Sequence, residues 1–153
     1  MAKFANRDQV VANLFIMKNV LVLCTGNSCR SQMAHGYLKT LGENKVNVWS
    51  AGIETHGLNQ EAVVAMKRDG IDISKHTSNL IEEYSEIEFN AVITVCDNAK
   101  ERCPIFPGKK KKLHQNFEDP SKFKGSKIDR IAEFDRVRNQ IKIYCTQFLQ
   151  HEI

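Results

Sequence analysis

The sequence predicts a single α/β domain in which a four-stranded parallel sheet carries helices on both faces. Apolar, strand-like runs alternate with helical segments along the chain, a pattern typical of parallel sheets with crossover helices. The chain has 153 residues, of which 42% are hydrophobic and 26% charged, enough for an ordinary core in one domain. Because no internal repeat, linker or low-complexity segment divides it, we expect an N-terminal extension over residues 1–17 and one domain over 18–153.

The expected elements follow in order along the chain. A short helix capped by Asp8 carries Val10, Val11, Leu14 and Phe15 on one face. The predicted strands cover 19–24, 46–51, 91–96 and 113–117, and the predicted helices cover 30–41, 60–69, 80–87 and a long closing segment. Gly42 is expected to end the first of these helices, and Asn59 to cap the second, which ends at Gly70. The closing helix is amphipathic, with apolar residues at spacings of three and four, namely Ile128, Ile131, Phe134, Val137, Ile141, Tyr144 and Phe148.

The stretch around which the chain is organised is V-L-V-L-C-T-G-N-S-C-R-S-Q-M-A-H-G at 20–36. It reads as a strand, a loop and a helix, so the N–H groups of the loop and of the helix start converge on one spot that favours an anion. Cys24 stands at the loop entrance and Arg30 six residues later. A wrapped loop sets a nucleophilic thiolate beneath a tetrahedral oxyanion and a guanidinium fork beside it.

The oxyanion-binding residues expected from this loop are Thr25, Gly26, Asn27, Ser28, Cys29, Arg30 and Ser31. Asn27 tolerates the left-handed backbone that a tight loop needs, and the serine hydroxyls can hydrogen-bond a thiolate or the loop itself. The alternative is that Cys24 is a buried residue at a strand end and Arg30 a surface charge.

Cys96 and Cys103 form a second group of thiols, seven residues apart. If the segment between them is helical, both lie on one face, two turns and about 10.5 Å apart. A disulfide needs Cα atoms roughly 4.4–6.8 Å apart, so the pair can bond only if the helix unwinds. The alternative is two small buried residues. A zinc site is not expected, because this spacing with His114 does not supply four ligands.

Asp119 precedes Pro120, which biases it toward an extended backbone in the loop after the fourth strand. A carboxylic acid held near an oxyanion can protonate a departing oxygen. Glu118, its neighbour, is the rival candidate for this role.

Composition excludes several other classes. The net charge is +4, and the run Lys109 to Lys112 is interpreted as a solvated loop rather than a nucleic-acid surface. No apolar stretch reaches membrane-spanning length and no signal peptide is seen, so we expect neither membrane nor nucleic acid as a partner. Five cysteines, an odd count, indicate reactive thiols in a reducing compartment, and therefore a cytoplasmic protein.

These motifs together resemble the thioredoxin-coupled arsenate reductases built on the low-molecular-weight tyrosine phosphatase fold. The matching segments are 24–36, S-A-G-I-E-T-H-G at 50–57, I-D-I-S-K-H-T-S at 71–78, V-I-T-V-C-D-N-A-K-E-R-C-P at 92–104 and F-E-D-P at 117–120. They span nearly everything after residue 17. The first motif is shared with the phosphatases, whereas the Cys96 and Cys103 pair is specific to the reductases.

The resemblance implies a redox cascade on arsenate. Cys24 attacks arsenic while Arg30 and the loop hold its oxygens and Asp119 protonates the leaving hydroxyl. Cys96 then attacks the Cys24 sulfur and releases arsenite, and Cys103 attacks Cys96. The resulting Cys96–Cys103 disulfide is offered to thioredoxin, the external reductant. No bound cofactor is implied.

The sequence departs from the family in places. Some members bind potassium through an Asn, a Ser and two acidic residues, and the matching positions here are Asn27, Ser50, His35 and Asn79. Both carboxylates are missing, which argues against a potassium site. Residues 1–17 extend beyond the usual start of the family. Gln115 and Asn116 stand where many relatives have a Trp-containing stretch.

Two other functions stay open at this stage. One is a low-molecular-weight protein tyrosine phosphatase that hydrolyses a Cys24-phosphate intermediate. These phosphatases usually carry aromatic residues just after the Asp-Pro, whereas Ser121 and Lys122 follow here. The other is a non-catalytic thiol switch that senses oxidants through Cys96 and Cys103.

Overall fold

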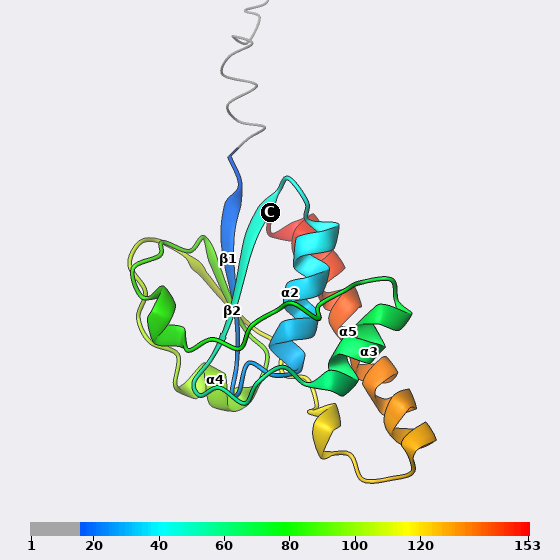
Figure 1. The fold of residues 1–153 in the computed structure, drawn as a ribbon. Helices are drawn as coiled ribbons and strands as arrows, with labels where there is room; N and C mark the ends of the chain where they lie inside the picture. Colours follow the sequence, from blue (N-terminus) through cyan, green and yellow to red (C-terminus); the bar gives the residue numbers. More distant parts are fainter. Residues whose placement is uncertain (1–15) are drawn as a thin grey trace, which may run out of the picture.

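The computed structural model describes residues 16–153, which form a parallel sheet and the helices packed on it (Figure 1). The chain order is β1 (Lys18–Cys24), α2 (Arg30–Leu41), β2 (Val46–Gly52), α3 (Gln60–Arg68), η1 (Ile81–Tyr84), β3 (Ala91–Thr94), α4 (Asp97–Glu101), β4 (Lys111–His114), η2 (Pro120–Lys122) and α5 (Lys127–His151). The expected helix around Val10 lies outside the described residues.

Strand β1 occupies the centre of the sheet, whose order is β2-β1-β3-β4. Its residues Val20 to Leu23 have no exposed surface, because β2 and β3 flank them in parallel and helices cover them. All four strands are parallel, so their carboxyl ends meet at one edge of the sheet, next to α4 in Figure 1. Ligands of such sheets bind at this edge, and Cys24 ends β1 there.

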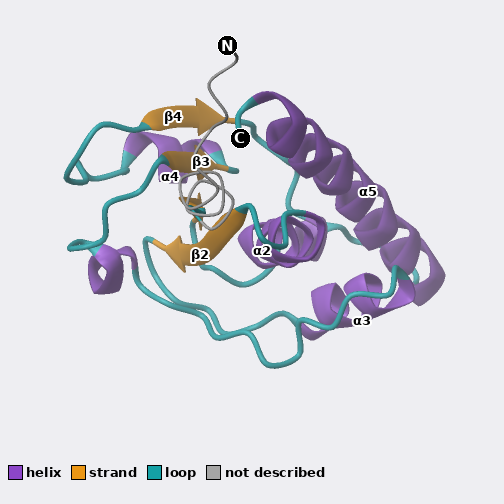
Figure 2. Ribbon diagram, turned by 90° about the horizontal axis from the view of Figure 1, so that it is seen from above, coloured by secondary structure: helices purple, strands orange, loops and turns teal. Residues whose placement is uncertain are grey.

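Helices cover both faces of the sheet, as predicted, but unequally. Figure 2 shows α2, α3 and α5 on one side, and the short α4 and η1 on the other. Helix α5 packs against α2 and buries Phe134, Val137, Ile141 and Phe148, which confirms most of its predicted apolar face. Ile128 and Ile131 are exceptions, 79% and 39% exposed, because they lie near the start of α5, and Tyr144 is only partly buried.

The predicted helix boundaries are confirmed where a capping residue sets them. The N–H of Gly42 bonds to the backbone oxygen of Leu38 at the end of α2. The side chain of Asn59 accepts the N–H of Ala62 at 2.9 Å and so caps α3. Gly70 follows the end of α3 and has a φ of +79°, in the left-handed region that favours glycine.

Several predicted boundaries are wrong. The last strand is Lys111–His114 instead of 113–117, and the third ends at Thr94 instead of Cys96. The lysine run is therefore not a loop throughout, since Lys111 pairs in register with Ala91. An edge strand keeps charged side chains in solvent, and such charges also discourage pairing with other chains. The predicted helix over 80–87 is one 3₁₀ turn, Ile81–Tyr84.

The short α4 also differs from the prediction that Cys96 and Cys103 share a helix face. The helix covers only Asp97–Glu101, with Cys96 as its N-cap and Cys103 beyond its last turn. Across the described residues 16–153, no helix combines the length and apolar character needed to cross a membrane.

Candidate active site

The loop between β1 and α2 wraps a small pocket at the carboxyl edge of the sheet. Asn27 has a φ of +46°, the left-handed conformation expected of it, which lets the loop reverse direction. The pocket measures about 240 Å³ and is lined by Cys24, Thr25, Gly26, Ser28, Cys29, Arg30, His56, Asp119, Ser121 and Lys122. Its volume suits a small tetrahedral oxyanion, and Arg30 and Lys122 in its lining supply positive charge.

Cys24 is buried at the floor of this pocket, and its sulfur receives two hydrogen bonds. The backbone N–H of Asn27 donates to Sγ at 3.2 Å, and the hydroxyl of Ser31 lies 2.9 Å from Sγ. The Asn27 side chain also donates to Oγ of Ser31 at 2.8 Å, so the single Ser31 proton is free to point at the sulfur. Both groups are placed to hydrogen-bond the sulfur from the loop side and so to orient it as a nucleophile.

Arg30 and Asp119 face each other at the rim of the pocket. Nη1 of Arg30 donates to the backbone oxygen of Phe117 at 2.9 Å, which orients the guanidinium, while Nη2 lies 3.7 Å from Oδ2 of Asp119. The other oxygen of Asp119 accepts the N–H and the hydroxyl of Ser121 at 3.0 and 2.6 Å. The structure therefore brings Asp119 to the site. Glu118 points elsewhere, 74% exposed and paired with Arg136 at 2.8 Å.

Cys96 lies beside the same loop, because it follows β3, which pairs with β1. Its Sγ is 3.2 Å from the hydroxyl of Thr25, which also accepts the side-chain N–H of Asn98 at 3.2 Å. Cys103 is partly exposed and lines a separate pocket of about 280 Å³ with Lys100, Lys112 and His114. All five thiols are free, so this arrangement corresponds to the reduced protein.

The other two cysteines are held in their neutral form. Burial, with the nearby Asp119 second, raises the pKa of Cys29 well above its usual range, although Cys29 also lines the pocket. Burial likewise raises the pKa of Cys145 to about 12. Thiols that stay protonated are poor nucleophiles, so Cys24 is the better-placed attacking group of the loop.

His56 and Lys122 were not expected at the site and add a basic rim to it. Lys122 lies in η2, directly after the Asp119 turn, and His56 pairs with Glu54 at 2.7 Å in the loop after β2. His56 packs so closely over Gly26 that a Cβ at position 26 would overlap its ring. The segment 50–57 is one of the motifs that carry the family resemblance, but nothing in its sequence indicates that His56 turns back over the loop.

With this loop between its central strand and the following helix, the protein is of the class of cysteine-dependent enzymes that hold an oxyanion over a thiol. The chain belongs to the low molecular weight phosphotyrosine protein phosphatase family, whose model matches residues 19–153. It is 48% identical, over 131 residues, to an arsenate reductase of Staphylococcus aureus strain Newman, a match that covers 86% of this chain and 95% of that protein.

Solved structures give a consistent picture of the fold. An arsenate reductase in the oxidized state has a TM-score of 0.76 at 32% identity, and one in the phosphate binding state has a TM-score of 0.72 at 33% identity. Each match covers 88% of this chain and 98% of the solved chain. The predicted fold class and family are confirmed.

Proposed function

We propose that this protein reduces arsenate to arsenite by a relay through Cys24, Cys96 and Cys103, and that thioredoxin restores the thiols. One observation carries the proposal: the thiol of Cys96 reaches the loop that cradles Cys24, through its 3.2 Å contact with Thr25. A phosphatase needs a single thiol at this place, whereas a reductase needs a second one within reach of the first. The similarity to arsenate reductases supports arsenate as the oxyanion.

In the first step, the Cys24 thiolate attacks arsenic and a S–As bond forms. The loop N–H groups and Arg30 hold the remaining oxygens, and Asp119 gives a proton to the departing oxygen, which leaves as water. The 3.7 Å separation of Arg30 and Asp119 supports this division of roles, because one substrate fits against both groups.

In the second step, Cys96 attacks the sulfur of Cys24. The S–As bond breaks and its electron pair stays on arsenic, so arsenic(V) becomes arsenic(III) and arsenite leaves. The two sulfurs are oxidised to a Cys24–Cys96 disulfide, and the Cys96 proton passes to solvent or to the product. Cys96 enters this step from the N-cap of α4, so the short helix is the element that moves.

In the third step, Cys103 attacks Cys96 and frees Cys24 as a thiolate. The Cys96–Cys103 disulfide then accepts two electrons from the dithiol of thioredoxin. Cys96 is the N-cap of α4 and Cys103 lies beyond its end, so this exchange brings the two ends of the short helix together. The partial exposure of Cys103 supports its role as the thiol nearest the external reductant. The odd number of cysteines suits a reducing compartment, and we place the reaction in the cytoplasm.

A weak phosphatase activity is the second candidate, favoured by the shared loop and by the family match. Phosphate would occupy the same pocket and Cys24 would attack phosphorus. Lys122 lines the pocket in the turn after Asp119 and does not offer the apolar wall that a phosphotyrosine ring prefers.

The test is NADPH consumption in the presence of arsenate, thioredoxin and thioredoxin reductase. Wild-type protein and Cys145→Ser should turn over, because Cys145 is buried against α2 away from the pocket. Cys24→Ser, Cys96→Ser and Cys103→Ser should each lose turnover. Hydrolysis of p-nitrophenyl phosphate that survives in the last two variants, with no arsenate-dependent turnover in wild type, would replace the reductase by the phosphatase.

A further inference from the structure

Behind the oxyanion loop, a buried chain of hydrogen bonds leads from the loop to a histidine. Gln32, on α2, has no exposed surface and donates its side-chain N–H groups to the backbone oxygens of Asn27 at 2.9 Å and Thr77 at 3.0 Å. Its amide oxygen lies 3.0 Å from Nδ1 of His76. Because the amide nitrogen faces two carbonyls, the amide oxygen must be the acceptor, and His76 therefore carries a proton on Nδ1.

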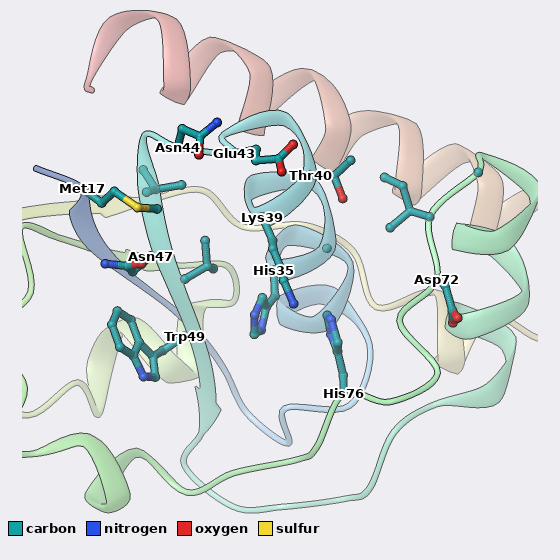
Figure 3. Close-up of a pocket in the computed structure, with 15 residues that line it drawn as sticks. Met17, His35, Lys39, Thr40, Glu43, Asn44, Asn47, Trp49, Asp72 and His76 are labelled. Carbon is teal, nitrogen blue, oxygen red and sulfur yellow. The ribbon is translucent and has the colours of Figure 1, made fainter. Parts of the chain in front are cut away.

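His35 packs against His76 and completes this cluster. The ring centroids are 4.4 Å apart, and Figure 3 shows both rings side by side, where they line a pocket of about 980 Å³. Nδ1 of His35 lies 2.8 Å from Oγ of Ser50 on β2. Burial, with smaller effects of His76 and Lys39, lowers the pKa of His35 to about 3, and burial also lowers the pKa of His76. At neutral pH the two rings are uncharged and pack without repulsion.

The side chains of this region do not fit the potassium site of some members of the family. Oδ1 of Asn27 accepts the backbone N–H of Asn79 at 2.8 Å, and Oδ1 of Asn79 accepts the hydroxyl of Thr77 at 2.7 Å. The hydroxyl of Ser50 is taken by His35. Potassium binds through oxygen atoms, and here an imidazole nitrogen stands in one of the four positions and no carboxylate in any.

We propose that Gln32 and the His35–His76 pair are positioning residues for Cys24, and that they hold the oxyanion loop without a monovalent cation. Only one residue separates Gln32 from Cys24 in this chain of hydrogen bonds. Gln32 fixes the backbone oxygen of Asn27, and the backbone N–H of Asn27 donates to the sulfur of Cys24. His76 orients Gln32, and the His35 ring packs against the ring of His76. The inference rests on the proposed role of Cys24 as nucleophile and does not involve the later thiols.

The first test is the rate at which iodoacetamide alkylates Cys24 at neutral pH, followed by the mass of the peptide that contains it. His76→Leu removes the hydrogen bond to Gln32, and Gln32→Met removes both donors at similar volume. Each variant should slow alkylation roughly 2- to 10-fold, the range for one or two hydrogen bonds. His76→Asn, whose side-chain N–H can replace Nδ1, should restore most of the rate. Folded variants of Gln32 and His76 that alkylate at the wild-type rate would overturn the proposal.

The second test uses the wild-type protein and covers the case in which the variants do not fold. Its melting temperature and its Cys24 alkylation rate should be the same in potassium, sodium and choline chloride at equal ionic strength. A rise in either quantity that is specific to potassium would overturn cation independence. Neither readout needs arsenate or thioredoxin, so a failure here is distinguishable from a failure of the reductase.

Discussion

The hydroxyl oxygen of Thr25 lies 3.2 Å from the sulfur of Cys96 and joins the oxyanion loop to the segment that bears the second thiol. Thr25 follows Cys24 directly, so the contact brings Cys96 to the edge of the oxyanion pocket. The same hydroxyl accepts the side-chain N–H of Asn98, in the first turn of α4. The loop and α4 are therefore linked before any disulfide forms.

Thr25→Val is expected to slow arsenate turnover by about 2- to 10-fold, because it removes a hydrogen bond at nearly constant volume. The substitution leaves the donors to Cys24 in place. The alkylation rate of Cys24 should therefore be unchanged while steady-state turnover falls. An equal loss in both measurements would mean that Thr25 acts on Cys24 instead of Cys96.

Asp119→Asn is expected to lower kcat for arsenate reduction by about 10²–10⁴, the range for a general acid. The amide keeps an acceptor for Ser121 but cannot deliver a proton to the leaving oxygen. Glu118→Gln is the matched control, since Glu118 is its neighbour and is paired with Arg136 away from the pocket. Similar losses in both variants would remove Asp119 from the proton-transfer step.

Lysines near Cys103 are expected to tune its reactivity. Burial raises the pKa of Cys103, and the charges of Lys112 and Lys110 oppose that rise. Lys112→Gln should therefore slow alkylation of Cys103 at neutral pH by roughly 2-fold, a difference that added salt reduces. Lys67→Gln, on α3, is the control. Equal rates in wild type and Lys112→Gln at low salt would contradict this prediction.

Acid should destabilise the fold through His35. Its pKa is lowered from 6.5 to about 3, so between these values the unfolded chain binds a proton that the folded chain does not. Stability therefore falls as pH decreases through this window, with a limiting slope of about 1.4 kcal/mol per pH unit. Urea unfolding at about pH 7 and pH 5 should show a smaller loss for His35→Asn than for wild type. The exposed His151→Asn should behave as wild type, and equal losses in all three proteins would refute the role of His35.

The part of the site that the sequence predicts is local. Cys24, Asn27 and Arg30 lie within one strand, loop and helix, whose short-range geometry sets where they point. Asp119 was placed by resemblance, because only the full topology brings the loop after β4 to face Arg30. The contact between Thr25 and Cys96 is of the same kind, since the pairing of β1 with β3 creates it.

Other features carry little or no sequence signal. Strand β4 begins at Lys111, inside a lysine run, because an edge strand contributes backbone hydrogen bonds and leaves its side chains in solvent. Gln32 resembles any polar residue on a helix, yet it is fully buried, because Thr77 and His76 come back over α2 from a distant segment. The spacing of polar and apolar residues along the chain does not indicate such a long-range polar contact.

The three thiols are proposed to react in the order Cys24, Cys96 and Cys103, and disulfide mapping by mass spectrometry can establish this order. Reduced protein is mixed with one equivalent of arsenate, without thioredoxin, and its peptides are mapped. We expect a Cys96–Cys103 disulfide in wild type, a Cys24–Cys96 disulfide in Cys103→Ser, and one equivalent of arsenite in both. A disulfide between Cys24 and Cys29, or arsenite released while Cys96 remains a free thiol, would contradict it.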